Sequence, residues 1–282
     1  MRSSSKHIEI HRCRPLLGTF VEIAATGASE SRLHLAINAA FAVIERIQKL
    51  MSAHDAQSEL SQLNREAASR PVIVSRETFA VLRRADRLAA ESKGAFDCTI
   101  APLLARWQIL PARLQRKKSG TWRDVRLLPG RKVYFRQPLA LDLGGIAKGF
   151  AVDMAIERLR KHGVSAAMVN AGGDLRTFGA QPSLIHLRHP ARPQLFAEKI
   201  QVRDAALATS SPCFTERSWQ GRQVSHLVDS IRRTAVTGAV SVTVRARECW
   251  LADALTKVVL NAPRLARKLL AKHRAEAFVL TV

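Results

Sequence analysis

The chain has 282 residues, of which 47% are hydrophobic and 24% are charged. A chain of this length and apolar content can bury one large core or two smaller lobes. Its 14 glycines and 11 prolines are ordinary for a globular protein, which excludes collagen-like and low-complexity classes. No apolar run reaches the roughly 18 residues that a membrane-spanning helix needs, so a transmembrane protein is also excluded.

The net charge is strongly positive, with 45 Lys and Arg against 23 Asp and Glu and a formal balance of +22. Such a balance favours contact with nucleic acid, an anionic membrane surface or a phosphate-bearing ligand. The basic residues are spread along the chain, and only one Tyr and four Trp are present to stack on bases. Because no nucleic-acid-binding motif accompanies them, a generally basic surface is favoured over nucleic-acid binding.

The four cysteines, Cys13, Cys98, Cys213 and Cys249, lie far apart and form no CxxC pair. Their spacing predicts neither a zinc site nor a disulfide framework. The N-terminal segment is basic but has no apolar core of about seven residues, so it does not resemble a secretory signal. The leucines near Cys13 follow that cysteine, which argues against a lipoprotein anchor. We therefore expect a cytoplasmic protein, either free or peripheral to the membrane.

Apolar periodicity predicts two helices in the first half of the chain. Apolar side chains recur every three or four residues over 33–51, which is typical of an amphipathic helix. A second helix is predicted over 75–93, where Ser75 is a suitable N-cap and Gly94 a suitable C′ residue. The other segments are an early strand over 19–23, a polar, turn-rich stretch over 52–64 and an irregular, basic surface segment over 108–135.

The second half mixes strands and helices without a regular βαβ alternation. This order favours an α+β fold over a doubly wound one. No linker is visible, so we expect one domain over 1–282 with a short N-terminal tail over 1–14. The expected elements are strands over 139–143, 166–170, 175–178, within 183–211, 240–246 and 278–282, a polar stretch up to 222, and helices over 150–162, 250–260 and from Pro263 onward.

The strongest local signal is the segment from Leu141 to Gly149, LDLGGIAKG. A predicted strand ends here, Gly144 and Gly145 allow the backbone to approach a ligand closely, and a helix N-terminus follows. Free N–H groups and the positive end of a helix dipole suit a phosphate, and Lys148 adds a positive charge. The segment matches neither GxxxxGK[ST] nor GxGxxG. Taken alone, a glycine-rich turn between a strand and a helix explains it equally well.

Two further segments carry acidic residues. Asp174 closes the glycine turn NAGGD, which suits a ligand contact but is more simply a turn. Asp253 and Thr256 lie three residues apart on one face of a predicted helix, with Lys257 next to them. Oxygen ligands of this kind suit Mg²⁺. On this pair alone, a solvated Asp on an amphipathic helix is the favoured explanation.

The segment SHLVD supplies a candidate proton acceptor. His226 titrates near neutral pH in its unperturbed state, and Asp229 follows three residues later. The alternative is a histidine with a purely structural role.

Together and in this order, these segments resemble the ApbE family, the FAD:protein FMN transferases. The resemblance runs from about Leu17 to Leu260 and so covers most of the chain. Eight matching blocks in the same order make a chance resemblance very improbable. The blocks are LGTFVEI (17–23), MSAHDAQSELSQLN (51–64), GAFDCTIAPL (94–103), LDLGGIAKGFAVD (141–153), VNAGGD (169–174), ATS (208–210), HLVD (226–229) and ADALT (252–256).

The resemblance implies a fold related to the T-fold and a transfer of FMN from FAD to a Ser or Thr hydroxyl of an acceptor protein, with AMP as the leaving group. Mg²⁺ would neutralise the pyrophosphate as the bond breaks. The implied acceptor is a membrane-bound redox subunit or a flavin carrier domain. The implied residues are His226, Asp253 and Asp174 for catalysis; Met51, Ala95, Phe96, Asp97, Gly144, Gly145 and Lys148 for FAD; and Asp253, Thr256 and the carbonyl of Ala147 for the metal.

Four positions depart from the family pattern. Lys257 stands where the family has Thr, and Ser230 stands where it has Pro. Ser211 replaces a Gly, and Cys98 replaces a Pro. These changes gather on the acceptor and metal side of the expected site. They leave open a protein that binds FAD without transferring it, as a flavin carrier or scaffold, and also hydrolysis of FAD to FMN and AMP.

Overall fold

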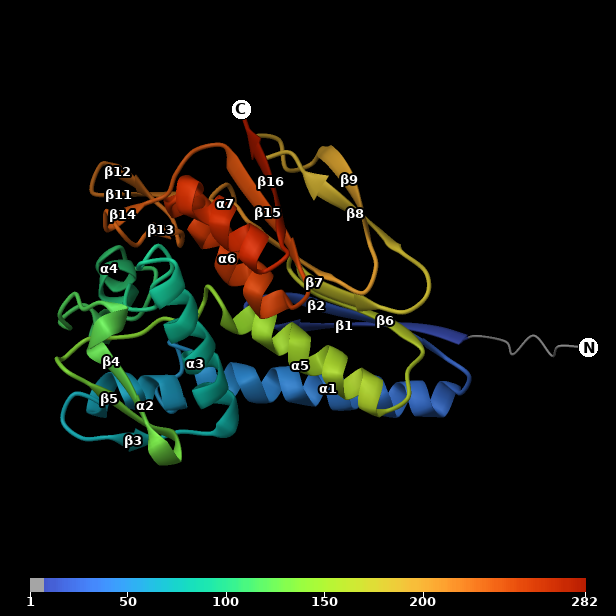
Figure 1. Cartoon of the computed structure of the whole chain (residues 1–282), viewed down its shortest axis with the longest axis horizontal. Coiled ribbons are helices and arrows are strands. Elements are labelled where there is room, and N and C mark those ends of the chain that lie inside the picture. The colour runs from blue at the N-terminus through green and yellow to red at the C-terminus, as the bar shows by residue number, and fades with distance from the viewer. Residues whose placement is uncertain (1–7) are drawn as a thin grey trace, which may run out of the picture.

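A seven-stranded sheet forms the centre of the computed structural model, which describes residues 8–282 (Figure 1). The strand order is β1-β2-β6-β7-β10-β15-β16, and each neighbouring pair is antiparallel. Helices are interspersed with these strands along the chain, so the predicted α+β class is confirmed. The bounds are β1 Ile8–Leu16, β2 Thr19–Gly27, β6 Ala166–Ala171, β7 Asp174–Phe178, β10 Ala206–Ser210, β15 Val240–Ala246 and β16 Glu276–Thr281.

The sheet begins with a tight hairpin. Leu17 and Gly18 have φ angles of 57° and 71°, the left-handed conformations of a type I′ turn between β1 and β2. The predicted tail over 1–14 is therefore wrong for residues 8–14, and residues 1–7 lie outside the described part of the chain. The sequence hides β1 because only Ile10 of its side chains is buried, so no apolar alternation marks it. Backbone pairing to β2 makes it a strand.

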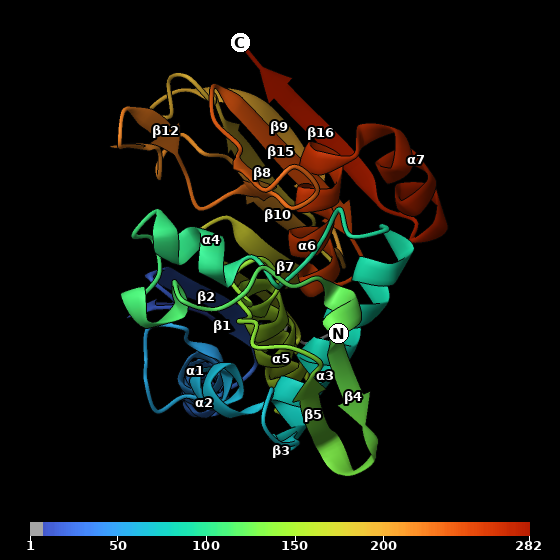
Figure 2. The same cartoon turned by 90° about the vertical axis from the view of Figure 1, so that its left-hand side faces the viewer.

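Helices cover one face of the sheet, and a hairpin covers the other (Figures 1 and 2). On the helical side, α1 packs against α5 and α5 against α6. Along β10, Ala206 and Ala208 join the main core, whereas Leu207 points to a second apolar cluster under the hairpin β8–β9. The bounds are α1 Glu30–Met51, α5 Ala147–Lys161, α6 Cys249–Asn261, α7 Pro263–Lys272, β8 Ser183–Arg188 and β9 Phe196–Val202.

The remaining part of the chain forms a smaller layer beside α1. It holds the helices α2, α3 and α4 and a three-stranded sheet in the order β3-β5-β4. The predictions of a turn-rich stretch over 52–64 and an irregular segment over 108–135 are wrong in part, because α2, β4 and β5 lie there. Each is too short to show a periodic apolar pattern. The bounds are α2 Glu59–Glu66, β3 Val72–Ile73, α3 Arg76–Glu91, α4 Ala101–Arg106, β4 Val125–Leu128 and β5 Lys132–Phe135.

The strand predicted over 139–143 is absent. The segment is extended and buried, but its partner is a side chain of α2 rather than a strand. Leu141 donates its N–H to Asn64 Oδ1 at 2.7 Å, and Asn64 Nδ2 donates back to the Leu141 carbonyl at 3.0 Å. One amide thus satisfies the backbone of a buried segment where a ladder would otherwise be needed.

Most other predicted elements are confirmed, with shifts of a few residues at their ends. Ser75 caps α3, since its side chain accepts the N–H of Thr78. The polar stretch up to residue 222 hides a small hairpin. Within residues 8–282, no helix is long and apolar enough to cross a bilayer. The small hairpins are β11 Arg217–Trp219 with β12 Arg222–Val224, and β13 Val228–Asp229 with β14 Thr234–Ala235.

Candidate active site

A cleft of about 1150 Å³ opens where α5 begins, at one end of the central sheet. Its walls come from the loop before α5, the loop over 94–98, the β6–β7 turn, the β8–β9 hairpin and the segment before β13. Asp174, Asp253 and Thr256 lie behind the wall, each at most 1% exposed. The fold therefore gathers segments that are far apart in the sequence. The predicted site residues that line the cleft are Met51, Ala95, Phe96, Asp97, Gly144, Gly145, Ala147, Lys148 and His226.

The N-terminus of α5 points its backbone toward this cleft. Ala147 donates its N–H to Leu143, and Gly149 donates its N–H to Asp253 Oδ2 at 3.3 Å. The N–H of Lys148 has no acceptor within residues 8–282. A free N–H at the positive end of a helix dipole is a favourable place for an anion.

Close contact between α5 and α6 fixes that geometry. A Cβ on Gly149 would lie 2.4 Å from the carbonyl oxygen of Cys249 and 2.8 Å from the Cα of Trp250. Both contacts are with backbone, which cannot turn aside as a side chain would. Only glycine fits here, and its absence of a side chain brings Asp253 on α6 to the first turn of α5.

The two helices cap each other with carboxylates. While Asp253 accepts from the start of α5, Asp153 on α5 accepts the N–H groups of Cys249 and Trp250 at the start of α6, both at 2.9 Å. Arg176 forms an ion pair with the same carboxylate, with Nη1 at 2.7 Å from Asp153 Oδ1. Burial raises the pKa of Asp153 to about 6, against the opposing effect of Arg176 and the two N–H donors.

The Asp253 carboxylate has a different partner, the ammonium of Lys257. Lys257 Nζ pairs with Asp253 Oδ1 and also donates to the Asp253 carbonyl at 3.0 Å. The Thr256 hydroxyl donates to the same carbonyl at 2.6 Å and lies 2.7 Å from Ser210 Oγ. The Lys257 side chain remains 17% exposed, and it lines the cleft.

These contacts do not fit the Mg²⁺ site expected from Ala147, Asp253 and Thr256. Mg²⁺ needs a near-octahedral set of oxygens at about 2.0–2.1 Å. Here an ammonium holds one Asp253 oxygen, a backbone N–H reaches the other, and the Thr256 hydroxyl is turned to Ser210. Within residues 8–282, no three His, Cys, Asp or Glu side chains gather to hold an ion.

A second ammonium lies beside the first pair. Lys148 Nζ is 2.8 Å from Asp174 Oδ2, and its side chain is 34% exposed. The neighbouring Asp174 charge raises the pKa of Lys148, so this amine is protonated at neutral pH. Burial and the charge of Asp253 raise the pKa of Asp174. The floor of the cleft thus carries two ammonium groups, each held by a buried carboxylate.

His226 lines the same cleft. Its ring is exposed to the cleft, and Nδ1 lies 2.5 Å from the Thr215 hydroxyl. The surrounding walls hinder hydration of a charged ring, and the ammoniums of Lys257 and Lys148 add repulsion, which lowers the pKa of His226 to about 4. The imidazole is therefore neutral near pH 7. Asp229, predicted beside it, instead accepts the backbone N–H groups of Ile231 and Arg232 in a local turn.

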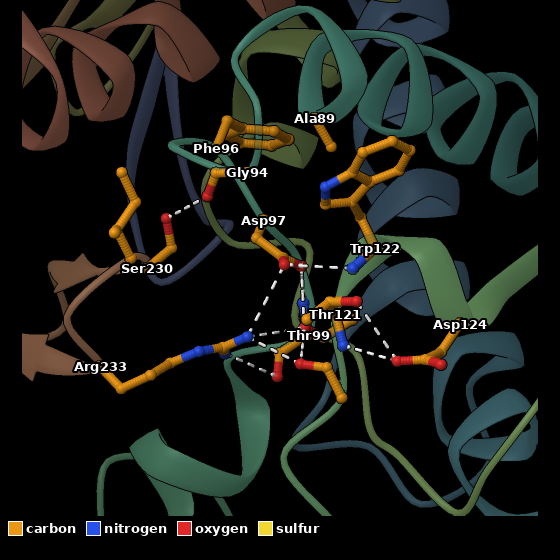
Figure 3. Close-up of polar contacts among 12 residues, drawn as sticks. Ala89, Gly94, Phe96, Asp97, Thr99, Thr121, Trp122, Asp124, Ser230 and Arg233 are labelled. Atoms are coloured by element: carbon orange, nitrogen blue, oxygen red, sulfur yellow. Dashed lines mark hydrogen bonds and ion pairs between the residues drawn. The ribbon is translucent and has the colours of Figure 1, made fainter.

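The loop over 94–97 is fixed by polar contacts around Asp97 (Figure 3). Asp97 Oδ1 accepts from the N–H and the hydroxyl of Thr99, both at 2.8 Å, and Oδ2 accepts the N–H of Trp122 at 3.1 Å. Arg233 approaches the same carboxylate at 3.7 Å. Asp97 lines the cleft, but its carboxylate oxygens accept hydrogen bonds from Thr99 and Trp122 and so stabilise the loop.

Ser230, one of the departures from the family pattern, supports the same loop. Its hydroxyl contacts the carbonyls of Gly94 at 2.7 Å and Ala95 at 2.9 Å, and Figure 3 shows it turned toward Gly94. Asn261, at the end of α6, donates to the Ala95 and Val228 carbonyls. The serine thus links the His226 segment to the loop that carries Phe96.

Many cleft residues are missing from the predicted site, among them Asp142 and Cys98. Asp142 lines the cleft, and burial raises its pKa, while the N–H of Gly144 and the charge of Lys257 oppose that rise. Cys98, one of the departures from the family pattern, also lines the cleft and accepts the N–H of Asp142 at its carbonyl. Asp142 directly precedes the glycine pair, and Cys98 lies within the GAFDC segment, so both positions carried a usable signal.

Comparison with known proteins agrees with this geometry. A family model described as the ApbE family matches residues 17–279. The FAD:protein FMN transferase of Vibrio cholerae is 29% identical over 268 residues, which is 88% of this chain and 79% of that protein. The protein of the same name from Treponema pallidum is 29% identical over 280 residues, 88% of this chain and 77% of its own length. The predicted resemblance is confirmed.

Solved structures share the fold. The ApbE protein from Thermotoga maritima superimposes with a TM-score of 0.85 at 24% identity, over 96% of this chain and 94% of its own. The flavin transferase ApbE from Vibrio cholerae gives a TM-score of 0.80 at 25% identity, over 97% and 94%. The antiparallel sheet with its helical layer is therefore a known arrangement.

Proposed function

The chain belongs to the ApbE family of flavin-transferring enzymes, and we propose that it moves FMN from FAD to a Ser or Thr hydroxyl of an acceptor protein and releases AMP. The observation that carries this proposal is the cleft itself. It combines a helix N-terminus with a free N–H, two ammonium groups and a neutral imidazole in one cleft. A pyrophosphate bound there would have both positive charge and a proton acceptor within the same cleft.

FAD would lie across the glycine loop with its pyrophosphate at the start of α5. Gly144 and Gly145 leave room for the phosphates, and Lys148 and Lys257 supply charge. Met51 and Phe96 provide apolar surface for the flavin or the adenine. The cleft volume of about 1150 Å³ is ample for a dinucleotide and for part of an acceptor loop.

In the transfer step, the acceptor hydroxyl oxygen attacks the FMN-side phosphorus. An O–P bond forms, the bridging P–O bond breaks, and AMP leaves with the electron pair. The proton of the hydroxyl passes to Nε2 of His226. That role requires Nδ1–H to donate to Thr215, the tautomer that leaves Nε2 free. The ammonium groups stabilise the charge that develops on the phosphate oxygens.

The partner follows from the chemistry. The acceptor needs a Ser or Thr on a segment slim enough to enter the cleft, and a membrane-bound redox subunit or a flavin carrier domain would supply one. The formal charge of +22 would draw an anionic dinucleotide toward the cleft and would favour a position near the anionic cytoplasmic face of a membrane. The family resemblance implies a dependence on Mg²⁺. The donor set around Asp253 does not fit that ion, so the proposed transfer does not include it.

A second candidate is a protein that binds FAD without transferring it. The contact that favours it is the ion pair between Lys257 and Asp253, which removes the expected metal ligand from use. Under this alternative the cleft would hold intact FAD, and no AMP would form.

The deciding experiment measures the intact mass of candidate carrier proteins after incubation with this protein and FAD. The expected result is a gain of one FMN less one water, with one AMP released for each modified carrier. A carrier whose acceptor hydroxyl is replaced by Ala is the matched control and should gain nothing. Stoichiometric FAD binding with no mass gain on a panel of carriers would favour the binding protein. Free FMN and AMP without a mass gain would indicate hydrolysis.

A further inference from the structure

The side chain of Lys257 lies where a divalent cation would be expected. Its Nζ touches both the carboxylate Oδ1 and the backbone carbonyl of Asp253, the two oxygens of that residue that face the same side. An ammonium and a hard cation compete for such oxygens, and they cannot hold the same position. The Asp253 side chain is only 1% exposed, so its charge needs a permanent partner nearby.

The other contacts around Asp253 also leave none of its oxygens free for a metal ion. Asp253 Oδ2 accepts the N–H of Gly149, and the Thr256 hydroxyl is shared between the Asp253 carbonyl and Ser210. Every described oxygen of Asp253 therefore has a donor from the chain itself. A metal ion could enter only by displacing the ammonium and turning the Thr256 hydroxyl away from its partners.

The ammonium also lies beside the glycine loop. A Cβ on Gly145 would be 3.3 Å from Lys257 Cε, so the lysine stem passes directly against the backbone of that loop. Lys257 lines the cleft, and its charge acts on His226, Asp142 and Asp174. The charge thus stands at the point where the pyrophosphate would lie.

We propose that Lys257 replaces the divalent cation in this protein, so that FMN transfer needs no metal. This inference rests on the proposed transfer from FAD. The ammonium of Lys257 donates a hydrogen bond to a pyrophosphate oxygen, while Asp253 holds it in place. The bonds formed and broken are those of the transfer itself: the acceptor O–P bond forms, the bridging P–O bond breaks, and AMP takes the electron pair.

Metal binding gives a test that does not depend on activity. The full chain, stripped with EDTA and desalted, is titrated with Mn²⁺ while free Mn²⁺ is followed by electron paramagnetic resonance. Wild type should bind no stoichiometric Mn²⁺, and neither should Lys268→Thr, the matched control at an exposed lysine of α7. Lys257→Thr, which vacates the Asp253 oxygens and adds a hydroxyl oxygen one turn away, should bind one Mn²⁺ per chain. Equal stoichiometric binding by wild type and Lys257→Thr would overturn the inference.

A second test measures the rate of FMN transfer with and without a chelator. With FAD and a carrier that accepts FMN, the wild-type rate should stay within about twofold when EDTA is added. The rate of Lys257→Thr should fall by about 100-fold or more in EDTA and recover with Mg²⁺. A wild-type rate abolished by EDTA and restored by Mg²⁺ would refute metal-free transfer and still uphold the transferase. If no carrier is modified under any condition, the proposed function fails, and the Mn²⁺ titration still decides whether Lys257 excludes the metal.

A thermal measurement covers the case in which Lys257→Thr folds poorly. Lys257→Met keeps the length of the side chain and removes its charge, so Asp253 is left buried without a counterion. Mg²⁺ should then raise the melting temperature of Lys257→Met and leave that of wild type unchanged. An equal rise in both proteins would contradict the proposal, since it would place a metal beside the lysine.

Discussion

Asp153 and Asp253 play mirrored parts at one helix crossing, yet only one of them belongs to the cleft. Each carboxylate accepts backbone N–H groups at the start of the other helix. Asp153 is paired with Arg176, and both side chains are less than 10% exposed. Asp253 is paired with Lys257, whose side chain reaches the cleft. The same chemistry thus makes a closed structural contact on one side and a ligand-facing charge on the other.

The difference lies in the cation rather than in the carboxylate. The guanidinium of Arg176 is held on a buried strand, β7, and has no path to a ligand. The ammonium of Lys257 sits on a flexible stem that lines the cleft, so it can donate to a phosphate while Asp253 stays capped by Gly149. Loss of the first pair should therefore reduce stability, whereas loss of the second should reduce turnover.

The largest expected effect is on turnover in Asp253→Asn. The substitution frees Lys257 from its position beside the pyrophosphate, and the rate should fall by roughly 1000-fold, or about 4 kcal/mol of barrier. Stability should change by only about 1 kcal/mol because Asn can still accept from Gly149. Carrier flavinylation followed by intact mass, together with urea unfolding, measures both. A rate within tenfold of wild type would show that the carboxylate does not position the charge.

Asp153→Asn should show the opposite pattern. Arg176 is left buried without its partner, and the free energy of unfolding should fall by about 3 kcal/mol. The rate per folded molecule should stay within about twofold of wild type because no group of this pair faces the cleft. Urea unfolding and rate measurements normalised to the folded fraction check the prediction. A strong loss of rate with unchanged stability would mean that the two pairs are not distinct.

Gly149→Ala should reduce both stability and turnover. The added methyl meets the backbone of Cys249, so the helices must separate, at a cost of about 1–3 kcal/mol in stability. Asp253 moves with α6, and turnover should fall as well. Gly163→Ala is a suitable control: it strains a residue with φ of 74° beyond the end of α5, has no close neighbour and lies away from the cleft. Gly163→Ala should lose stability but keep its rate per folded molecule.

The pH dependence contributed by His226 is small near neutral pH and grows as the pH falls. Its pKa is lowered to about 4 in the folded protein, below the unfolded value near 6.5. As pH falls from 6.5 to 4 the unfolded chain binds the proton first, so this group makes the folded state less stable. His226→Gln should remove that slope, measured by urea unfolding between pH 4 and 7. The wild-type rate should show no inflection near pH 6.5, and one that disappears in His226→Gln would contradict the low pKa.

Long periodic segments and the glycine-rich loop are the features that the sequence predicts well. The apolar stripe over 33–51 becomes α1, and Ser75 caps α3 as expected. Short elements fail: β1 has one buried side chain, and the segment around Leu141 is held by Asn64, 77 residues away. An apolar segment can pattern like a strand and yet pair with a distant amide side chain, which local periodicity does not distinguish.

By itself, the sequence determined the class of fold, the family and a set of site residues most of which line the cleft, because ordered motifs and periodic helices are local properties of the chain. Only the tertiary structure decided what those residues touch. The contact between Gly149 and Asp253 spans 104 positions, and that between Asp153 and Cys249 spans 96. Such pairs depend on how closely α5 and α6 cross. The ion pair between Asp253 and Lys257 is an i,i+4 contact within α6 that spacing alone could suggest. Its position against the first turn of α5 depends on the crossing, which no spacing along the chain could have specified.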